Sequence, residues 1–158
     1  MVKKSWKEKL ENRKNLPRVE RISEKMINKW GEGTVAIPTP KEIDEIIKKI
    51  PEGKIVTVDE IRKFIAKKYN ATIGCPITIG IFIIISANAS FEDEQNGIKE
   101  ITPYWRVVKK DGLLNEKYPG AINNQKDRLE KEGHSIISKG KLFFIKNYQE
   151  KLFNLNLI

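Results

Sequence analysis

The chain of 158 residues has one cysteine, one histidine and no long apolar run. Because Cys75 is alone, it can form neither an internal disulfide nor a thiolate zinc site, which indicates a reducing, cytoplasmic setting. The longest apolar run, 79–85, is far shorter than the ~20 residues that a transmembrane helix needs. We therefore expect no membrane partner, no metal ion and no cofactor.

Positive charge is in excess. The chain has 30 Lys and Arg against 21 Asp and Glu, a net charge of +9 and a pI near 9.5. Residues 1–30 hold ten of the basic and four of the acidic side chains, and their lysines interrupt any apolar stretch that a secretion signal would need. Such a balance favours a polyanionic partner, because cationic side chains neutralise phosphates and release counterions.

The length predicts one domain, or one domain with an N-terminal attachment. We divide the chain into a basic, helical N-terminal extension, 1–38, and a second part, 39–158. Within the extension, apolar spacing predicts helices over 6–14 and 20–30, separated by a proline turn, and then a short extended stretch. Spacing leaves open whether the extension folds onto the rest of the chain.

Capping residues place the helices of the second part. Thr39 with Glu42, and Thr57 with Glu60, each form a capping box that predicts a helix start. An isoleucine stripe follows the first box, and an apolar face opposite a basic one follows the second.

Cys75 and Pro76 predict the start of a third helix. The apolar run that follows is ambiguous, since its β-branched residues favour a strand and its proline and alanines favour a helix. We expect an acidic loop over 91–100, a helix over 123–131 and a hairpin around Lys139 and Gly140.

Several short motifs carry a family resemblance. Residues 101–112 read Ile-Thr-Pro-Tyr-Trp-Arg-Val-Val-Lys-Lys-Asp-Gly and resemble the Ile-Pro-Cys-His-Arg-Val-Val loop and Asp-Gly turn of the methylated-DNA–protein-cysteine methyltransferases. Residues 50–57 resemble that family's Ile-Pro-x-Gly-x-Val-x-Thr. Further matches are Tyr118 with Gly120, and Leu129 with Glu132 and Gly133. The resemblance covers about 40–135. It implies a mostly α fold with small β elements, a winged helix-turn-helix of the alkyltransferase C-terminal domain type.

The sequence departs from the family's pattern at the positions of its catalytic and base-extruding residues. Tyr104 and Trp105 stand where the family has its nucleophilic cysteine and the following histidine. Val58 and Ile77 fall where it has a nucleotide-turning tyrosine and an intercalating arginine. The chain resembles the alkyltransferase-like branch, which also lacks the cysteine and binds alkylated guanine without repairing it. That branch implies a non-catalytic protein that recognises alkylated or distorted double-stranded DNA and hands it to a repair partner.

The resemblance also implies two sets of site residues. In a lesion pocket that takes up an extruded base, Tyr104 and Trp105 would form a stacking wall. That pocket comprises Pro103, Tyr104, Trp105, Arg106 and Glu132. The alternative is that the two aromatic rings are core and that Arg106 is in a structural ion pair. The expected DNA-binding residues are Arg62, Lys63, Thr78, Lys109 and Lys110, with Asn88 as a further exposed candidate.

Two other functions stay open. A winged-helix module for protein interaction or general DNA binding would need no lesion pocket, and its interface would be the apolar third helix and the extension. A transferase could instead use Cys75, since a helix N-terminus activates a thiol. His134 follows a helix end, where we expect it to contact the terminal carbonyls.

Overall fold

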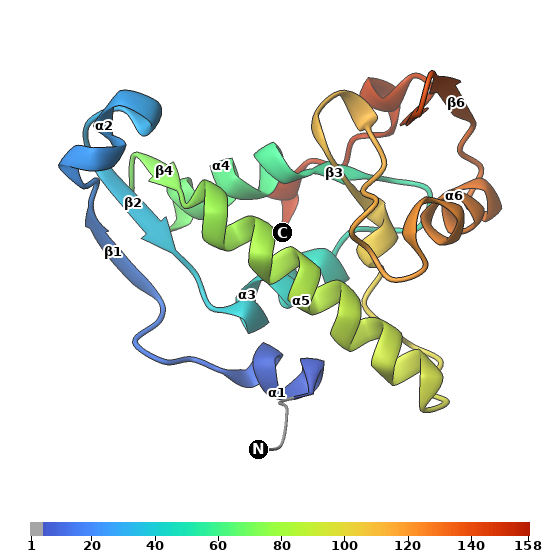
Figure 1. Cartoon of the computed structure of the whole chain (residues 1–158), viewed down its shortest axis with the longest axis horizontal. Coiled ribbons are helices and arrows are strands. Elements are labelled where there is room, and N and C mark those ends of the chain that lie inside the picture. The colour runs from blue at the N-terminus through green and yellow to red at the C-terminus, as the bar shows by residue number, and fades with distance from the viewer. Residues whose placement is uncertain (1–4) are drawn as a thin grey trace.

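The computed structural model describes residues 5–158 (Figure 1). Its elements run in the order α1 (Trp6–Glu11), β1 (Arg18–Arg21), α2 (Glu24–Trp30), β2 (Thr34–Ile37), α3 (Pro40–Lys48), β3 (Val56–Thr57), α4 (Val58–Lys68), β4 (Ile73–Gly74), α5 (Pro76–Gln95), β5 (Val107–Val108), α6 (Ala121–Lys131), β6 (Ile136–Lys139) and β7 (Leu142–Ile145). Short 3₁₀ helices cover Tyr104–Arg106, Lys110–Gly112, Tyr148–Lys151 and Leu155–Leu157. Helix α5 crosses the middle of the molecule, with α2 near one end of the view and α6 near the other (Figure 1). Over residues 5–158, no helix is both long enough and apolar enough to span a membrane.

The threonine half of both predicted capping boxes is confirmed, whereas the Glu42 carboxylate accepts from the Tyr69 hydroxyl at 2.6 Å and pairs with Lys68. The hydroxyl oxygen of Thr39 accepts a hydrogen bond from the Glu42 backbone N at 3.0 Å, and that of Thr57 accepts from the Glu60 backbone N at 3.2 Å. Each bond satisfies an N–H group that the first turn of a helix otherwise leaves unpaired. These local bonds start α3 and α4 where the sequence predicts.

The ambiguous apolar run is helical, and α5 extends into the expected acidic loop. The prediction of a loop over 91–100 is therefore wrong for its first half, since the helix ends at Gln95. Tertiary contacts explain the extra turns: Glu92 accepts a hydrogen bond from the Trp6 backbone N at 3.1 Å, and Asp93 pairs with Lys7 at 3.1 Å. The acidic side chains thus hold α1 at its N-terminal end.

The prediction of one helix over 20–30 is also wrong. Arg18–Arg21 form β1, which pairs antiparallel with β2, and α2 begins only at Glu24. Pairing with β2 overrides the helical spacing, because the backbone groups of this stretch bond to a neighbouring strand. Strand β2 also pairs in parallel with β4, immediately before α5. The first helix is likewise shorter than predicted and ends at Glu11.

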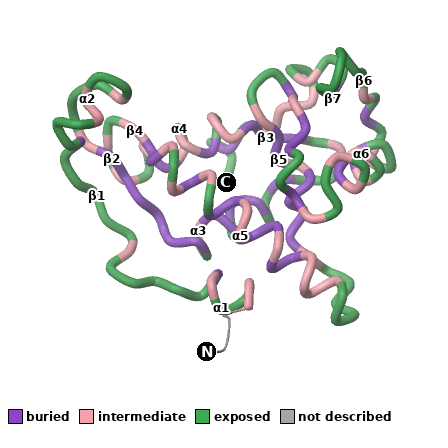
Figure 2. The backbone as a smooth tube through the Cα atoms, in the orientation of Figure 1, coloured by how far each residue is buried: buried purple, intermediate pink, exposed green. Residues whose placement is uncertain are grey.

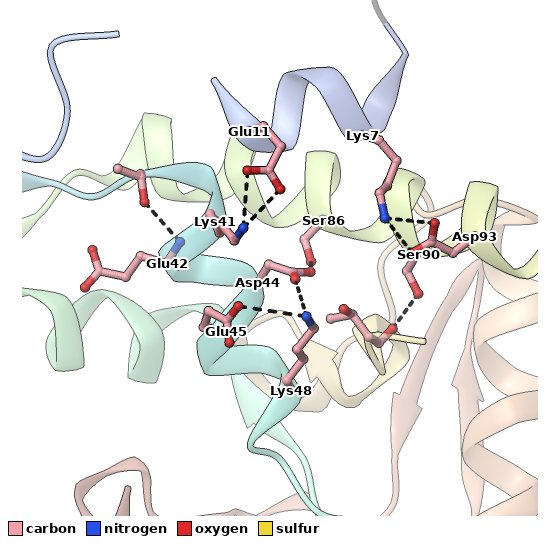
Figure 3. Close-up of polar contacts among 12 residues, drawn as sticks. Lys7, Glu11, Lys41, Glu42, Asp44, Glu45, Lys48, Ser86, Ser90 and Asp93 are labelled. Carbon is pink, nitrogen blue, oxygen red and sulfur yellow. Dashed lines mark hydrogen bonds and ion pairs between the residues drawn. The ribbon is translucent and has the colours of Figure 1, made fainter. Parts of the chain in front are cut away.

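Helix α1 lies against α3 and α5, where Figure 3 shows a set of polar contacts. Glu11 accepts from Lys41 Nζ at 3.2 Å. Below this pair, the buried carboxylate of Asp44 accepts a hydrogen bond from the Ser86 hydroxyl at 2.6 Å and pairs with Lys48 at 3.3 Å. The N-terminal segment therefore covers part of α5, which accounts for some of that helix's apolar surface.

One large core lies between α3, α4, α5 and the strands β3 and β5, which pair in parallel (Figure 2). A smaller cluster lies between α2 and the β1–β2–β4 sheet. The predicted terminal hairpin is confirmed as β6–β7. After it, the tail pairs with the chain before β3: the Ile55 backbone N donates to Lys151 O at 3.0 Å, and the Phe153 backbone N donates to Ile55 O at 2.8 Å.

Candidate nucleic-acid interface

The aromatic loop, residues 103–106, contains the 3₁₀ helix Tyr104–Arg106. Tyr104 is completely buried, and its ring makes edge-to-face contacts with Trp105 and Tyr118 at centroid distances of 5.3 and 5.4 Å. Its hydroxyl oxygen accepts a hydrogen bond from Asn124 Nδ2 at 2.9 Å. Burial raises the pKa of Tyr104 above its ordinary value of 10.0, so the phenol is protonated at neutral pH. A buried, neutral phenol is not a nucleophile.

Glu132, at the end of α6, joins this loop to the turn that follows α3. Its carboxylate accepts from Trp105 Nε1 at 2.8 Å, from Arg106 Nη2 at 2.8 Å and from the Gly53 backbone N at 3.2 Å. Arg106 also donates from Nη1 to Ile50 O at 2.7 Å. Burial acts to raise the pKa of Glu132, but the hydrogen bonds from Arg106, Trp105 and Gly53 outweigh it and hold the pKa below its ordinary value. Arg106 is therefore in a structural ion pair, in agreement with the alternative expectation for this residue.

The five residues expected in the lesion pocket are thus neighbours in space, Pro103 included as the buried residue that precedes the 3₁₀ helix. Two hollows, of about 510 and 340 Å³, flank Trp105, one against Pro103 and Arg106 and the other against Arg128 and Glu132. Neither is lined by Tyr104. The ring of Tyr104 occupies the interior at this point, and the Arg128 guanidinium lies 4.7 Å from the Trp105 ring centroid.

A further concave surface lies between the start of α4, the first half of α5 and the loop 109–117. We call it the α5 groove. Its volume is about 820 Å³, and its walls are Thr57, Val58, Asp59, Glu60, Arg62, Ile77, Gly80, Ile81, Ile84, Lys109, Lys110, Asp111, Asn115, Lys117, Tyr148 and Leu152. Three of the five expected DNA-binding residues, Arg62, Lys109 and Lys110, are in this set.

The other two do not line the groove. Lys63 is exposed on α4 and pairs with Asp59 at 3.2 Å. Thr78 is half-buried, and its hydroxyl oxygen lies 3.1 Å from Cys75 Sγ, so its polar atoms serve the start of α5. Asn88, also half-buried, donates to Ile84 O at 2.9 Å. The expectation that Thr78 and Asn88 are freely exposed is wrong, because both side chains bond within α5.

The walls of the α5 groove include both charged and apolar side chains. Arg62 pairs with Asp59 at 3.0 Å, and Lys109 pairs with Glu116 at 3.2 Å. Lys110 and Lys117 are exposed and have no ion-pair partner within 4.0 Å among residues 5–158. The α5 wall is apolar, with Ile77 exposed by 58% and Ile81 by 52%. Exposed lysines thus lie beside an apolar helix face.

Sequence reasoning missed the contribution of the C-terminal tail to this groove. Tyr148 and Leu152 lie outside the stretch that resembles the methyltransferases, and no motif or spacing marks them. The one local signal is Gly112, whose φ is +81°. A Cβ there would lie 2.8 Å from Tyr148 Cβ, so the tail packs directly against the backbone of the 109–117 loop.

Cys75 and His134 are placed away from the groove walls. Cys75 is buried in the smaller core cluster, where its Sγ accepts from the Thr78 backbone N at 3.4 Å at the start of α5. His134 is buried, and neither ring nitrogen has a hydrogen-bond partner among the described residues. The His134 backbone N donates to Leu129 O at 3.1 Å, so the residue does contact a terminal carbonyl of α6, but its ring takes no part in that contact. Burial lowers the pKa of His134, as do Lys151 and Arg106, against an opposing effect of Glu132.

No family model and no curated protein matches the chain. Solved structures do. One is S. pombe Atl1 in complex with damaged DNA containing O6-carboxymethylguanine, with a TM-score of 0.49, and another is S. pombe ATL in complex with DNA, with a TM-score of 0.52. Each is 22% identical to this chain and covers 72% of it and 93% of its own length. The second likeness shows the fold: a helix-turn-helix of the alkyltransferase-like type, mostly α with small sheets.

Proposed function

We propose that the protein binds double-stranded DNA and recognises alkylated or distorted sites without transferring the alkyl group. The observation that carries the proposal is the α5 groove. In this groove, the loop 109–117 brings Lys109, Lys110 and Lys117 beside the first half of α5. Lysines on a loop beside a helix suit contacts to phosphates, which position a protein on a duplex. The fold shared with S. pombe ATL, crystallised with DNA, supports this reading.

The absence of alkyl transfer follows from the side chains at the aromatic loop. The Tyr104 phenol is protonated and enclosed, and the Trp105 indole N–H is committed to Glu132. Cys75 belongs to a different core cluster from Tyr104 and is bonded at a helix start. The loop therefore presents no activated nucleophile to a bound base.

In this proposal the aromatic loop supports the groove from behind. Residues 103–106 lead into β5, which pairs with β3, and β3 leads directly into α4. The Arg106–Glu132 pair holds that frame rigid, so the groove keeps its width when a base is extruded towards it. Pro103, Tyr104 and Trp105 then act as the fixed back of a recognition site, not as its lining.

Equilibrium binding to two matched duplexes tests the proposal, one with a single O6-methylguanine and one with guanine, at several salt concentrations. We expect tighter binding to the lesion, and affinity for both duplexes that falls with salt by a slope of about −0.9 per phosphate neutralised. The double change Lys110→Gln and Lys117→Gln should reduce the slope by about two contacts. Lys139→Gln with Lys141→Gln, on the exposed hairpin turn, is the matched control.

Each outcome points to one function. Salt-dependent binding that ignores the lesion indicates a general DNA-binding module, and the absence of binding to either duplex contradicts the proposal. Incubation with radiolabelled methylated DNA tests catalysis: label on the wild-type protein that disappears in a Cys75→Ser variant would show a transferase.

A protein-interaction module is the second candidate, because Ile77 and Ile81 expose more than half of their surface. Exposed isoleucines four residues apart on one helix suit an apolar partner surface. In that case Ile77→Ser and Ile81→Ser would leave DNA binding unchanged and raise the solubility of the isolated chain.

A further inference from the structure

Of the described residues that line the α5 groove, Tyr148 is the one aromatic side chain. It is half-buried and begins the 3₁₀ helix Tyr148–Lys151, after the β6–β7 hairpin. The two aromatic rings of the 103–106 loop are unavailable to a ligand, since Tyr104 has no exposed surface and Trp105 is 9% exposed. Any ring that a ligand meets in this groove is therefore that of Tyr148.

The chain holds Tyr148 in place from two sides. Before it, the hairpin is joined to the groove loop, because the Leu114 backbone N donates to Phe143 O at 2.9 Å. After it, the tail is joined to Ile55 through Lys151 and Phe153. Gly112 lets the Tyr148 side chain rest directly on the loop backbone. An aromatic ring held this way loses little conformational freedom when a ligand stacks on it.

The neighbours of Tyr148 in the groove suit a nucleotide. Ile77, Ile81 and Leu152 supply apolar wall, and Lys110 and Lys117 supply exposed positive charge at the loop. A nucleotide has a flat aromatic base, which can stack on a ring and contact an apolar wall. Its phosphate can contact the lysines at the edge of the groove. A volume of about 820 Å³ is within the range of small-molecule sites, which are ~300–1,000 Å³.

We infer that Tyr148 is the stacking platform for a base extruded from DNA into the α5 groove. The inference rests on the proposed function and assigns to the C-terminal tail the aromatic contact that the 103–106 loop cannot make. It also makes the tail, from the hairpin to Leu152, part of the recognition site.

Three forms of the protein test the inference: wild type, Tyr148→Phe and Tyr148→Leu. Phenylalanine keeps the ring, and leucine keeps apolar packing on Gly112 without one. Base–aromatic stacking predicts that leucine weakens binding to the O6-methylguanine duplex by about 10- to 100-fold and that phenylalanine changes it little. Binding to the undamaged duplex, which needs no extruded base, should change less than twofold in both variants.

Nitration of the wild-type protein with tetranitromethane gives a second measurement that needs no variant. We expect the lesion duplex to protect Tyr148 more than the undamaged duplex does, with buried Tyr104 and Tyr118 as unreactive references. If the wild type prefers the lesion but Tyr148→Leu keeps that preference and the ring stays reactive, the inference fails and the proposed function stands. If the wild type binds neither duplex, the proposed function fails, and the inference fails with it.

Discussion

The ion pair between Arg106 and Glu132 links the aromatic loop to the rest of the fold, and its removal should be strongly destabilising. The two side chains are 14% and 7% exposed, and the carboxylate also accepts from Trp105 and Gly53. Loss of one partner leaves a buried charge unpaired, which typically costs about 3–5 kcal/mol. We therefore expect Glu132→Leu, and separately Arg106→Leu, to lower the free energy of unfolding by about that amount.

Urea unfolding followed by circular dichroism measures the loss. For a small protein with a slope of about 1–3 kcal/mol per molar urea, the midpoint should fall by more than about 1 M. The double variant should lose clearly less than the sum of the two single losses, because neither buried charge is then left alone. Lys109→Leu, which breaks the exposed pair with Glu116, is the control and should cost under about 1 kcal/mol. Single losses below 1 kcal/mol that add in the double variant would refute this reasoning.

Three further changes test other parts of the structure. Gly112→Ala should cost about 1–3 kcal/mol in urea unfolding, since φ there is +81° and the new Cβ would meet Tyr148; an unchanged midpoint would contradict that packing. Asp44→Ala should cost about 1–3 kcal/mol by leaving the buried Ser86 hydroxyl without its acceptor, and Asp44→Ala combined with Ser86→Ala should recover part of the loss. For His134, burial lowers the folded-state pKa below the ordinary 6.5, so the unfolded chain takes up a proton first and stability falls as pH drops from 7 to 5. A His134→Phe variant should lose less stability over that interval, and equal losses in the two proteins would exclude this cause.

Local sequence signals located most elements that depend on neighbouring residues. Thr39 and Thr57 cap α3 and α4 as expected, because a threonine hydroxyl reaches the backbone N three residues ahead whatever the rest of the fold does. The terminal hairpin is confirmed for the same reason, since its turn and strands are adjacent in the chain. Helical spacing failed to predict that Glu20 pairs with Val35 in a strand. It also failed to predict that Glu92 stays helical and accepts a hydrogen bond from the backbone N of Trp6, which is far from it in the sequence.

The short motifs were sufficient to anticipate the helix-turn-helix fold, because each motif consists of residues that are close together in the sequence. Whether Tyr104 opens onto a pocket or fills it depends on Asn124, Tyr118 and Trp105, which surround the ring only after folding. The wall that Tyr148 adds to the α5 groove likewise comes from a tail without any recognisable motif. A groove is formed by surfaces from distant parts of the chain, and so its shape and lining are properties of the packed molecule.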